Sequence, residues 1–234
     1  MALPPTENNE FHVFCVHPDA SFPICNTSSP TNPIWMGSAN VNHNINAIVV
    51  RGDYAYLATS GDTKELIVLN VLNPSIITEV NSFDAQDVFN NPSDEDGTSI
   101  YVLGSKVYLG RERVNNAAER DFYILHENDL SILGSKRICW FSSPADPIPD
   151  CLSNNTAIVG IVISGSRAFL ATNDSNAGFQ VWNIFDPSNI FQESKCSAYN
   201  YSEKATSIDF IDNFGFISNE DNKALRVIYD QPTA

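Results

Sequence analysis

The sequence predicts an all-β protein, a small β-propeller of four four-stranded blades, with five as the alternative count. Three observations favour this fold. Short segments alternate apolar and polar residues, as strands with one buried face do. One hairpin pattern occurs four times along the chain, and further short strands follow it each time. Four short strands in a repeat of about 40 to 60 residues are typical of a propeller blade, and no segment has the periodicity of a helix.

Each repeat begins with two short strands joined by a tight turn. The turns are Gly52-Asp53, Gly104-Ser105, Gly165-Ser166 and Asp212-Asn213. These residue types tolerate positive φ, which a two-residue turn between right-twisted strands requires. The hairpins that they predict cover residues 47–58, 99–110, 160–171 and 207–218.

A third and a fourth strand are predicted after the hairpins. The third strands are expected at residues 66–69, 122–125, 179–182 and 225–228. Two of them run into an Asx-Pro turn, at Asn73-Pro74 and Asp186-Pro187, where the fixed φ of proline ends the strand. The fourth strands are expected at residues 76–80, 132–135 and 190–192.

The two ends of the chain are predicted to close the ring together. Residues 11–16 and 34–38 have the pattern of third and fourth strands, whereas the last repeat stops after its third strand. The strand near Trp35 is therefore expected to complete the sheet of residues 205–229, because this removes an exposed sheet edge. The strand at 11–16 is then surplus. It indicates an incomplete fifth blade, an extra edge strand or a chain cut from a longer protein.

The domain organisation follows from the repeats. A chain of 234 residues can bury one substantial core. We expect a flexible segment at residues 1–10 and a single propeller domain at residues 11–230. The repeat units are expected at about 45–95, 96–156, 157–204, and 205–230 together with 11–41.

The repeats resemble LVIVD repeats of bacterial cell-surface proteins, including pilin-like ones. The resemblance is carried by residues 50–58 (VRGDYAYLA) and 66–74 (LIVLNVLNP), and again by residues 96–112. It covers roughly residues 11–230. It implies a propeller and an exported location, and it brings no catalytic motif. Two positions depart from the pattern: Asp212-Asn213 replaces the glycine turn, and the second repeat leaves its third strand at His126-Glu127 without the proline.

The charge of the chain excludes one class of partner. Asp and Glu number 28 against 13 Lys and Arg, which gives a net charge of -15. Nucleic-acid binding depends on cationic side chains that displace counterions, so we expect no nucleic-acid partner. We also expect no transmembrane segment, because no apolar run approaches the roughly 18 residues that span a bilayer.

The five cysteines predict disulfide bonds. Cys15 and Cys25 flank one short proline-containing loop, and Cys139 and Cys151 flank another. Local pairs of this kind are typical of an oxidising compartment, and four N-glycosylation triplets agree with it. Cys196 is left over, and five unrelated buried thiols are the alternative interpretation.

The expected localisation is therefore extracellular or at the cell surface. The first residues, Met1 to Pro5, lack the basic and apolar regions of a signal peptide. Either the protein is cytosolic, or the export segment is absent from this sequence.

A calcium site is the strongest candidate for bound metal, and no other cofactor is indicated. Asp94 and Asp96 alternate with Glu95 and end at Gly97, and calcium prefers several oxygens from a sharply turned segment. An EF-hand is excluded, because its twelfth position is Ser105 rather than Glu. A solvated acidic loop is the alternative interpretation.

Four residues are candidates for ligand contact. Trp140 and Phe141 lie in the loop between Cys139 and Cys151, where an exposed aromatic ring could stack on a sugar or a protein. His43 and Tyr201 lie in other predicted loops. Burial or simple solvation is the alternative for each. The recurring aromatic residues are instead expected in the core between blades: Tyr54, Tyr56, Tyr101, Tyr108, Phe169, Phe214 and Phe216.

These observations predict a non-enzymatic extracellular β-propeller for adhesion, display or protein or glycan interaction through loops between its blades. Neither a nucleophile elbow nor a phosphate-binding glycine-rich loop occurs, so no catalytic residue is predicted. One alternative is a metal-dependent propeller hydrolase or lectin. Another is the structural head of a pilin-like subunit that assembles into a filament or oligomer.

Overall fold

The structure is a computed structural model that describes most of the chain. It covers residues 9–18, 21, 23–61, 63–85, 95–113, 120–140, 150–151, 156–193, 203–212, 214–220 and 225–229. Within these ranges the regular elements are β-strands and two short 3-10 helices, so the all-β prediction is confirmed. None of the described helices is long and apolar enough to cross a membrane.

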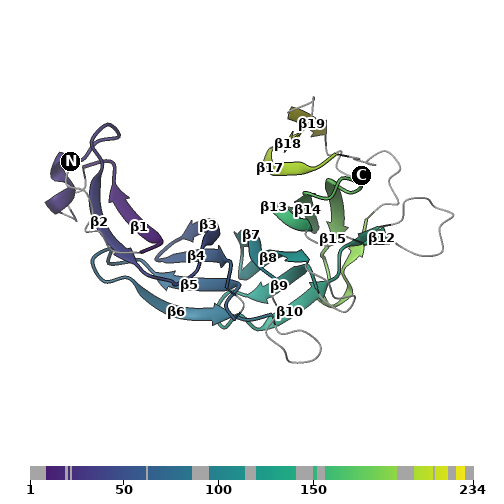
Figure 1. Ribbon diagram of the computed structural model, residues 1–234, viewed down its shortest axis with the longest axis horizontal. Coiled ribbons are helices and arrows are strands. Elements are labelled where there is room, and N and C mark those ends of the chain that lie inside the picture. Colours follow the sequence, from purple (N-terminus) through teal and green to yellow (C-terminus); the bar gives the residue numbers. More distant parts are fainter. Residues whose placement is uncertain are drawn as a thin grey trace.

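Successive antiparallel sheets follow one another along an arc (Figure 1). Blade I comprises β3 (Ile45–Arg51), β4 (Tyr54–Thr59), β5 (Leu66–Asn70) and β6 (Thr78–Phe83). Blade II comprises β7 (Gly97–Leu103), β8 (Lys106–Arg113), β9 (Phe122–His126) and β10 (Ile132–Lys136). Blade III comprises β13 (Thr156–Ser164), β14 (Arg167–Thr172), β15 (Phe179–Asn183) and β16 (Phe191–Gln192). Blade IV comprises β17 (Ala205–Ile211), β18 (Phe214–Asn219) and β19 (Leu225–Tyr229).

Three smaller elements complete the described chain. The N-terminal hairpin consists of β1 (Phe11–Cys15) and β2 (Ile34–Ala39), with the 3-10 helix η1 (Pro23–Thr27) between them. A two-stranded ladder of β11 (Cys139–Trp140) and β12 (Asp150–Cys151) lies between blades II and III in the sequence. The 3-10 helix η2 (Pro187–Asn189) joins the last two strands of blade III.

The predicted hairpin turns are confirmed in their backbone geometry. Gly52, Gly104 and Gly165 have φ of 58°, 61° and 57°. Asp212 takes the same conformation at the fourth turn, with φ of 55°. Aspartate tolerates this region better than most residues, which explains why the hairpin survives without a glycine.

A bulge at a matching position marks the first strand of every blade. The register of β3 with β4 shifts between Ile45 and Ala47, and that of β7 with β8 shifts between Gly97 and Ser99. The same shift occurs in β13 and in β17. Bulges increase local twist, so each sheet twists alike and the next can stack on its face.

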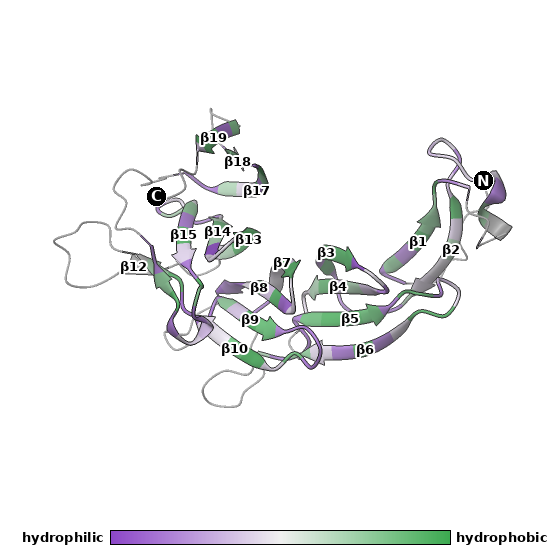
Figure 2. Cartoon of the chain, turned by 180° about the vertical axis from the view of Figure 1, so that it is seen from behind, coloured by the Kyte–Doolittle hydropathy of each residue, from purple (hydrophilic) through white to green (hydrophobic). Residues whose placement is uncertain are grey.

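The hydrophobic core lies between neighbouring sheets. Side chains alternate between the two faces of a strand, so blades I to III each bury one face against the preceding unit and the other against the next. In blade I, Leu69 packs towards the N-terminal hairpin, whereas Leu66 packs towards blade II. Across that second junction the rings of Phe83 and Tyr123 meet edge to face at 5.3 Å. Figure 2 shows the apolar residues that run along β5 and β9.

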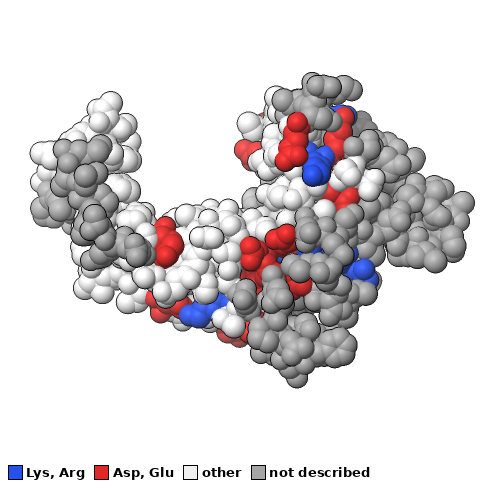
Figure 3. All heavy atoms as spheres, viewed as in Figure 1, with Lys and Arg blue, Asp and Glu red and all other residues white. Residues whose placement is uncertain are grey.

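The predicted closure of the ring is wrong for the described strands. The N-terminal hairpin and blade IV lie at opposite ends of the arc (Figure 1), and open space separates them in the view of Figure 3. β2 pairs with β1, and β19 pairs with β18 alone. β2 pairs with β1 along one edge, and no described strand pairs with its other edge, so the hairpin is a unit of its own. The described sheets are thus propeller-like. The strands of blades II and III form one eight-stranded sheet, because β13 also pairs with β8 at its end.

A disulfide joins the end of β1 to η1. Cys15 and Cys25 are bonded, as predicted, with their Cα atoms 5.8 Å apart. We expect the double variant Cys15→Ser with Cys25→Ser to lose about 2–4 kcal/mol of local stability in this hairpin. Hydrogen exchange measures it: amides of β1 and β2 should exchange faster, while those of blade II keep their rates. Unchanged protection of β1 would show that the bond does not stabilise the hairpin.

A cavity at the junction of blades I and II

At two junctions between neighbouring units, the same backbone contact packs one unit closely against the next. A glycine in the last strand of one unit lies against the loop that follows the third strand of the next. A Cβ atom at Gly37 would collide with the carbonyl oxygen of Pro74, and one at Gly134 would collide with that of Pro187. These two glycines are equivalent by register, because Gly37 pairs with Val13 and Gly134 with Ile124. The contact seals the N-terminal hairpin against blade I, and blade II against blade III.

The junction of blades I and II lacks this contact. Asn81 pairs with Val68 and therefore takes the place of the two glycines. In the facing loop, Leu130 takes the place of the proline. Glu127 stands at the position that holds Val71 in blade I and Ile184 in blade III, where Ile184 is buried in the core. All three substitutions lie at one junction.

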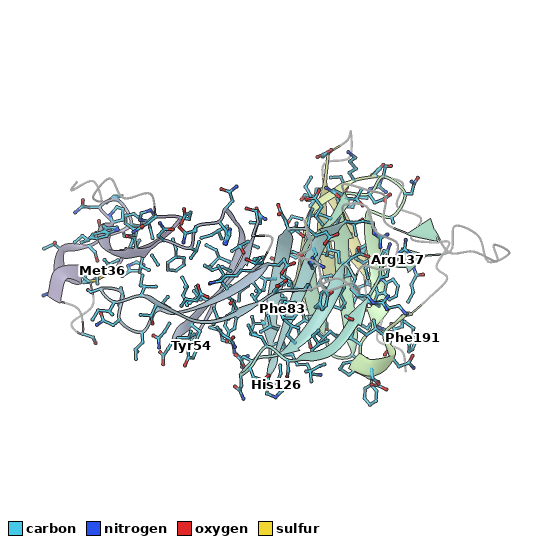
Figure 4. All side chains as sticks on the ribbon, turned by 60° about the horizontal axis from the view of Figure 1, so that its bottom comes forward. Met36, Tyr54, Phe83, His126, Arg137 and Phe191 are labelled. Carbon is cyan, nitrogen blue, oxygen red and sulfur yellow. A yellow bond between two sulfur atoms is a disulfide. The ribbon has the colours of Figure 1, made fainter. Side chains whose placement is uncertain are left out.

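A cavity of about 390 Å³ occupies this place. Such a volume falls within the roughly 300–1,000 Å³ of small-molecule sites. Val80 is the extra residue of a bulge in β6, since Glu79 and Asn81 pair with successive residues of β5. In Figure 4, Tyr54 and His126, the neighbour of Glu127, lie along the same edge of the molecule. The cavity is lined by Tyr54, Tyr56, Val68, Val80, Asn81, Glu127 and Asn128.

A hydrogen bond crosses the cavity wall from one blade to the other. The Tyr56 hydroxyl donates to Oε1 of Glu127 at 2.9 Å. Burial, helped by this bond and by the charge of Glu127, raises the pKa of Tyr56 well above its ordinary value. Tyr56 is therefore a neutral donor at physiological pH. Arg51 approaches the same carboxylate at 3.3 Å from the half-exposed rim and also donates to the Gly104 carbonyl.

The loop on the blade II side is held in an unusual conformation. Leu130 has φ of 56°, in the left-handed region that bulky residues rarely adopt. Such a residue costs about 1–3 kcal/mol, and strain of this kind clusters at ligand sites. The Leu130 side chain is buried in the core between blades I and II, which compensates for the cost and fixes the positions of Glu127 and Asn128.

A cluster of buried ion pairs joins blades I and II at the other end of the same junction. Nη2 of Arg111, at the end of β8, lies 2.8 Å from Glu65 and 2.9 Å from Glu95. All three side chains are buried. Glu65 also accepts from the Ala85 amide at 2.9 Å, and the Arg111 guanidinium lies over the Tyr123 ring at 5.6 Å. Blades I and II are thus joined by buried ion pairs at one end of the junction and enclose the cavity at the other.

The residues predicted to contact ligand do not form the cavity. His43 precedes β3 at the opposite end of blade I, where its ring packs against Gly61. Phe141 and Tyr201 lie outside the described residues, and so does the side chain of Trp140. Of the predicted contact residues, the structure thus describes the side chain of His43 alone, and it lies at the other end of blade I from the cavity.

Of the two residues predicted to bind calcium, Asp94 and Asp96, the structure describes Asp96 alone. Asp96 is half-buried, and its carbonyl accepts from the Glu112 amide at 2.9 Å. Burial, with the charges of Asp96 and Glu95, raises the pKa of Glu112. Asp94 lies outside the described residues. Among the residues that are described, no group of three or more His, Cys, Asp or Glu side chains could hold a metal ion.

The second predicted disulfide agrees with the backbone register. Cys139 lies directly opposite Cys151 in the β11–β12 ladder, and Cys139 is disulfide-bonded. The side chain of Cys151 lies outside the described residues, so the pairing of these two cysteines stays a prediction.

Sequence reasoning missed the cavity. It assigned Tyr54 and Phe214 to the core, whereas these residues are 41% and 47% exposed. Asn81 and Asn128 do not belong to any sequence motif that would indicate a site. One signal was available: the exit of the second repeat at His126-Glu127 departs from the pattern, because an acidic residue replaces an apolar one and the proline is missing.

Comparison with known proteins finds similar solved structures. No protein-family model matches the chain, and no curated protein matches it. The computationally designed Ika4 protein is similar at TM-score 0.52 and 13% identity, over 81% of this chain and 92% of Ika4. The computationally designed Ika8 protein gives TM-score 0.54 and 14% identity, over 85% of this chain and 50% of Ika8. BamB from Moraxella catarrhalis gives TM-score 0.49 and 10% identity, over 87% of this chain and 50% of BamB.

Proposed function

We propose that the protein is a non-enzymatic, extracellular binding protein that holds a carbohydrate in the cavity between blades I and II. The observation that carries this proposal is the replacement of the junction-closing residues by Asn81, Glu127 and Leu130. The replacement opens a cavity lined by tyrosine rings and hydrogen-bonding groups.

The chemistry of the wall favours a neutral polyol. Tyr54 offers a ring on which the C–H face of a sugar can stack, beside the exposed Val80. Glu127, Asn81 and Asn128 offer acceptors and donors for hydroxyl groups. Because Arg51 and Tyr56 already compensate the carboxylate, the cavity does not demand a cation. The net charge of -15 disfavours an anion.

Two observations support an extracellular location. The Cys15–Cys25 disulfide is typical of an oxidising compartment. The resemblance of the repeats to LVIVD repeats of surface proteins agrees with it. A protein that binds surface or environmental glycans needs no catalytic group, and adhesion is the role that fits such binding.

A glycan array followed by calorimetry tests the proposal. We expect wild-type protein to bind a defined oligosaccharide, and Tyr54→Ala to weaken binding by about tenfold or more, because a stacked aromatic ring contributes about 2 kcal/mol at a binding hot spot. Glu127→Gln should weaken it less, since an amide still accepts one hydrogen bond. The control is Phe191→Ala, which removes an aromatic ring of similar exposure on blade III and should leave affinity unchanged.

Two results would contradict the proposal. One is an array without a binding glycan. The other is a Tyr54→Ala variant that binds as tightly as wild type.

A further inference from the structure

The outer face of blade IV is apolar and uncovered by any described residue. Leu225, Val227 and Tyr229 alternate along β19 and are 62%, 56% and 51% exposed. Phe214 of β18 is 47% exposed on the same face, and its ring lies 5.2 Å from that of Tyr229.

This face is the one that blades I to III bury against the next blade. By register, Leu225 and Val227 correspond to Leu66 and Val68 of blade I, which are 0% and 5% exposed. The corresponding Phe122 and Ile124 of blade II are also buried. The repeat therefore places a blade-binding surface on blade IV.

The N-terminal hairpin presents the complementary kind of surface. Phe14 of β1 is 46% exposed, and Val16 beyond it is 43% exposed. The residues equivalent to Phe14 are Leu69 in blade I and Leu125 in blade II, and both are buried against the preceding unit. The hairpin already packs its other face on blade I, through Phe11.

We propose that the outer face of blade IV packs on the N-terminal hairpin of a second copy of this chain, so that two arcs close into one ring. Each contact repeats the face-to-face packing of the internal junctions. A dimer with two-fold symmetry makes both contacts at once and leaves neither surface exposed. This inference does not depend on the proposed carbohydrate site.

The charge of the protein predicts how association responds to salt. Two copies of net charge -15 repel each other, and salt screens this repulsion, while the contact surfaces themselves are apolar. We therefore expect the dimer dissociation constant to fall as ionic strength rises from about 0.01 to 0.15 M.

Analytical ultracentrifugation of the full chain tests the proposal. Wild type should sediment as a dimer, and Val227→Asp and Phe14→Asp should each sediment as monomers. The control is Phe185→Asp, at an 82% exposed position of blade III, which should remain dimeric. An equimolar mixture of the first two variants should regain dimers, because each variant keeps the surface that the other has lost. This recovery would also show that both variants are folded.

Three results would overturn the proposal. Wild type that stays monomeric at all concentrations is the first. The second is loss of dimers in Val227→Asp but not in Phe14→Asp, which indicates pairing of two β19 edges instead. The third is growth into open polymers rather than closed dimers.

Discussion

Replacing Arg111 by alanine is expected to lower the free energy of unfolding by about 3–5 kcal/mol, because it leaves buried carboxylates without their counterion. Arg111 is 1% exposed, and it bridges Glu65 of blade I and Glu95, which precedes blade II. Removing the guanidinium leaves two like charges in a buried junction.

Chemical denaturation measures this effect, with Lys64→Ala as the matched control. Lys64 and Glu79 form an ion pair of 2.6 Å, but both side chains are more than a third exposed. Such surface pairs contribute about 0–1 kcal/mol. Equal losses for the two variants would show that burial of the Arg111 cluster is not what matters at this junction.

Trp182→Ala is expected to lower the free energy of unfolding by about 3–5 kcal/mol. Trp182 is 2% exposed in the core between blades II and III. Its indole N–H donates to Gln180 at 2.8 Å, and the Lys136 ammonium of blade II lies 5.9 Å from its ring. Alanine would leave a large cavity at this junction and an unsatisfied amide.

Phe185→Ala is the control for this prediction. Phe185 lies three residues further along the same blade and is 82% exposed, so truncation should change stability by less than about 0.5 kcal/mol. Thermal and denaturant unfolding of both variants measures the two changes in the free energy of unfolding. A Trp182→Ala protein as stable as Phe185→Ala would contradict the packing of blades II and III.

The repeat architecture could be predicted because it follows from local patterns in the sequence. Turn residues that tolerate positive φ fix the hairpins, as Gly52 and Gly104 do, and alternating apolar residues fix the strands. The closure of the ring could not be predicted in this way. It depends on how far each sheet rotates from the last and on whether β2 is free to pair, and neither is a local property.

The cavity lies beyond sequence reasoning for a related reason. Asn81 and Glu127 are 46 positions apart in numbering, and they meet only because β6 packs beside the loop of the next blade. Each looks like an ordinary polar residue in its own segment. Only comparison of equivalent positions, with Gly37 and Gly134 in the other junctions, shows that they stand where a closing contact is expected.

A crystal structure of the protein with its best-binding oligosaccharide tests the proposed site most directly. We predict a sugar ring stacked on Tyr54, with hydroxyl groups within hydrogen-bond distance of Glu127 and Asn128. A sugar bound at the loops between blades, with an empty cavity beside Tyr54, would contradict the account.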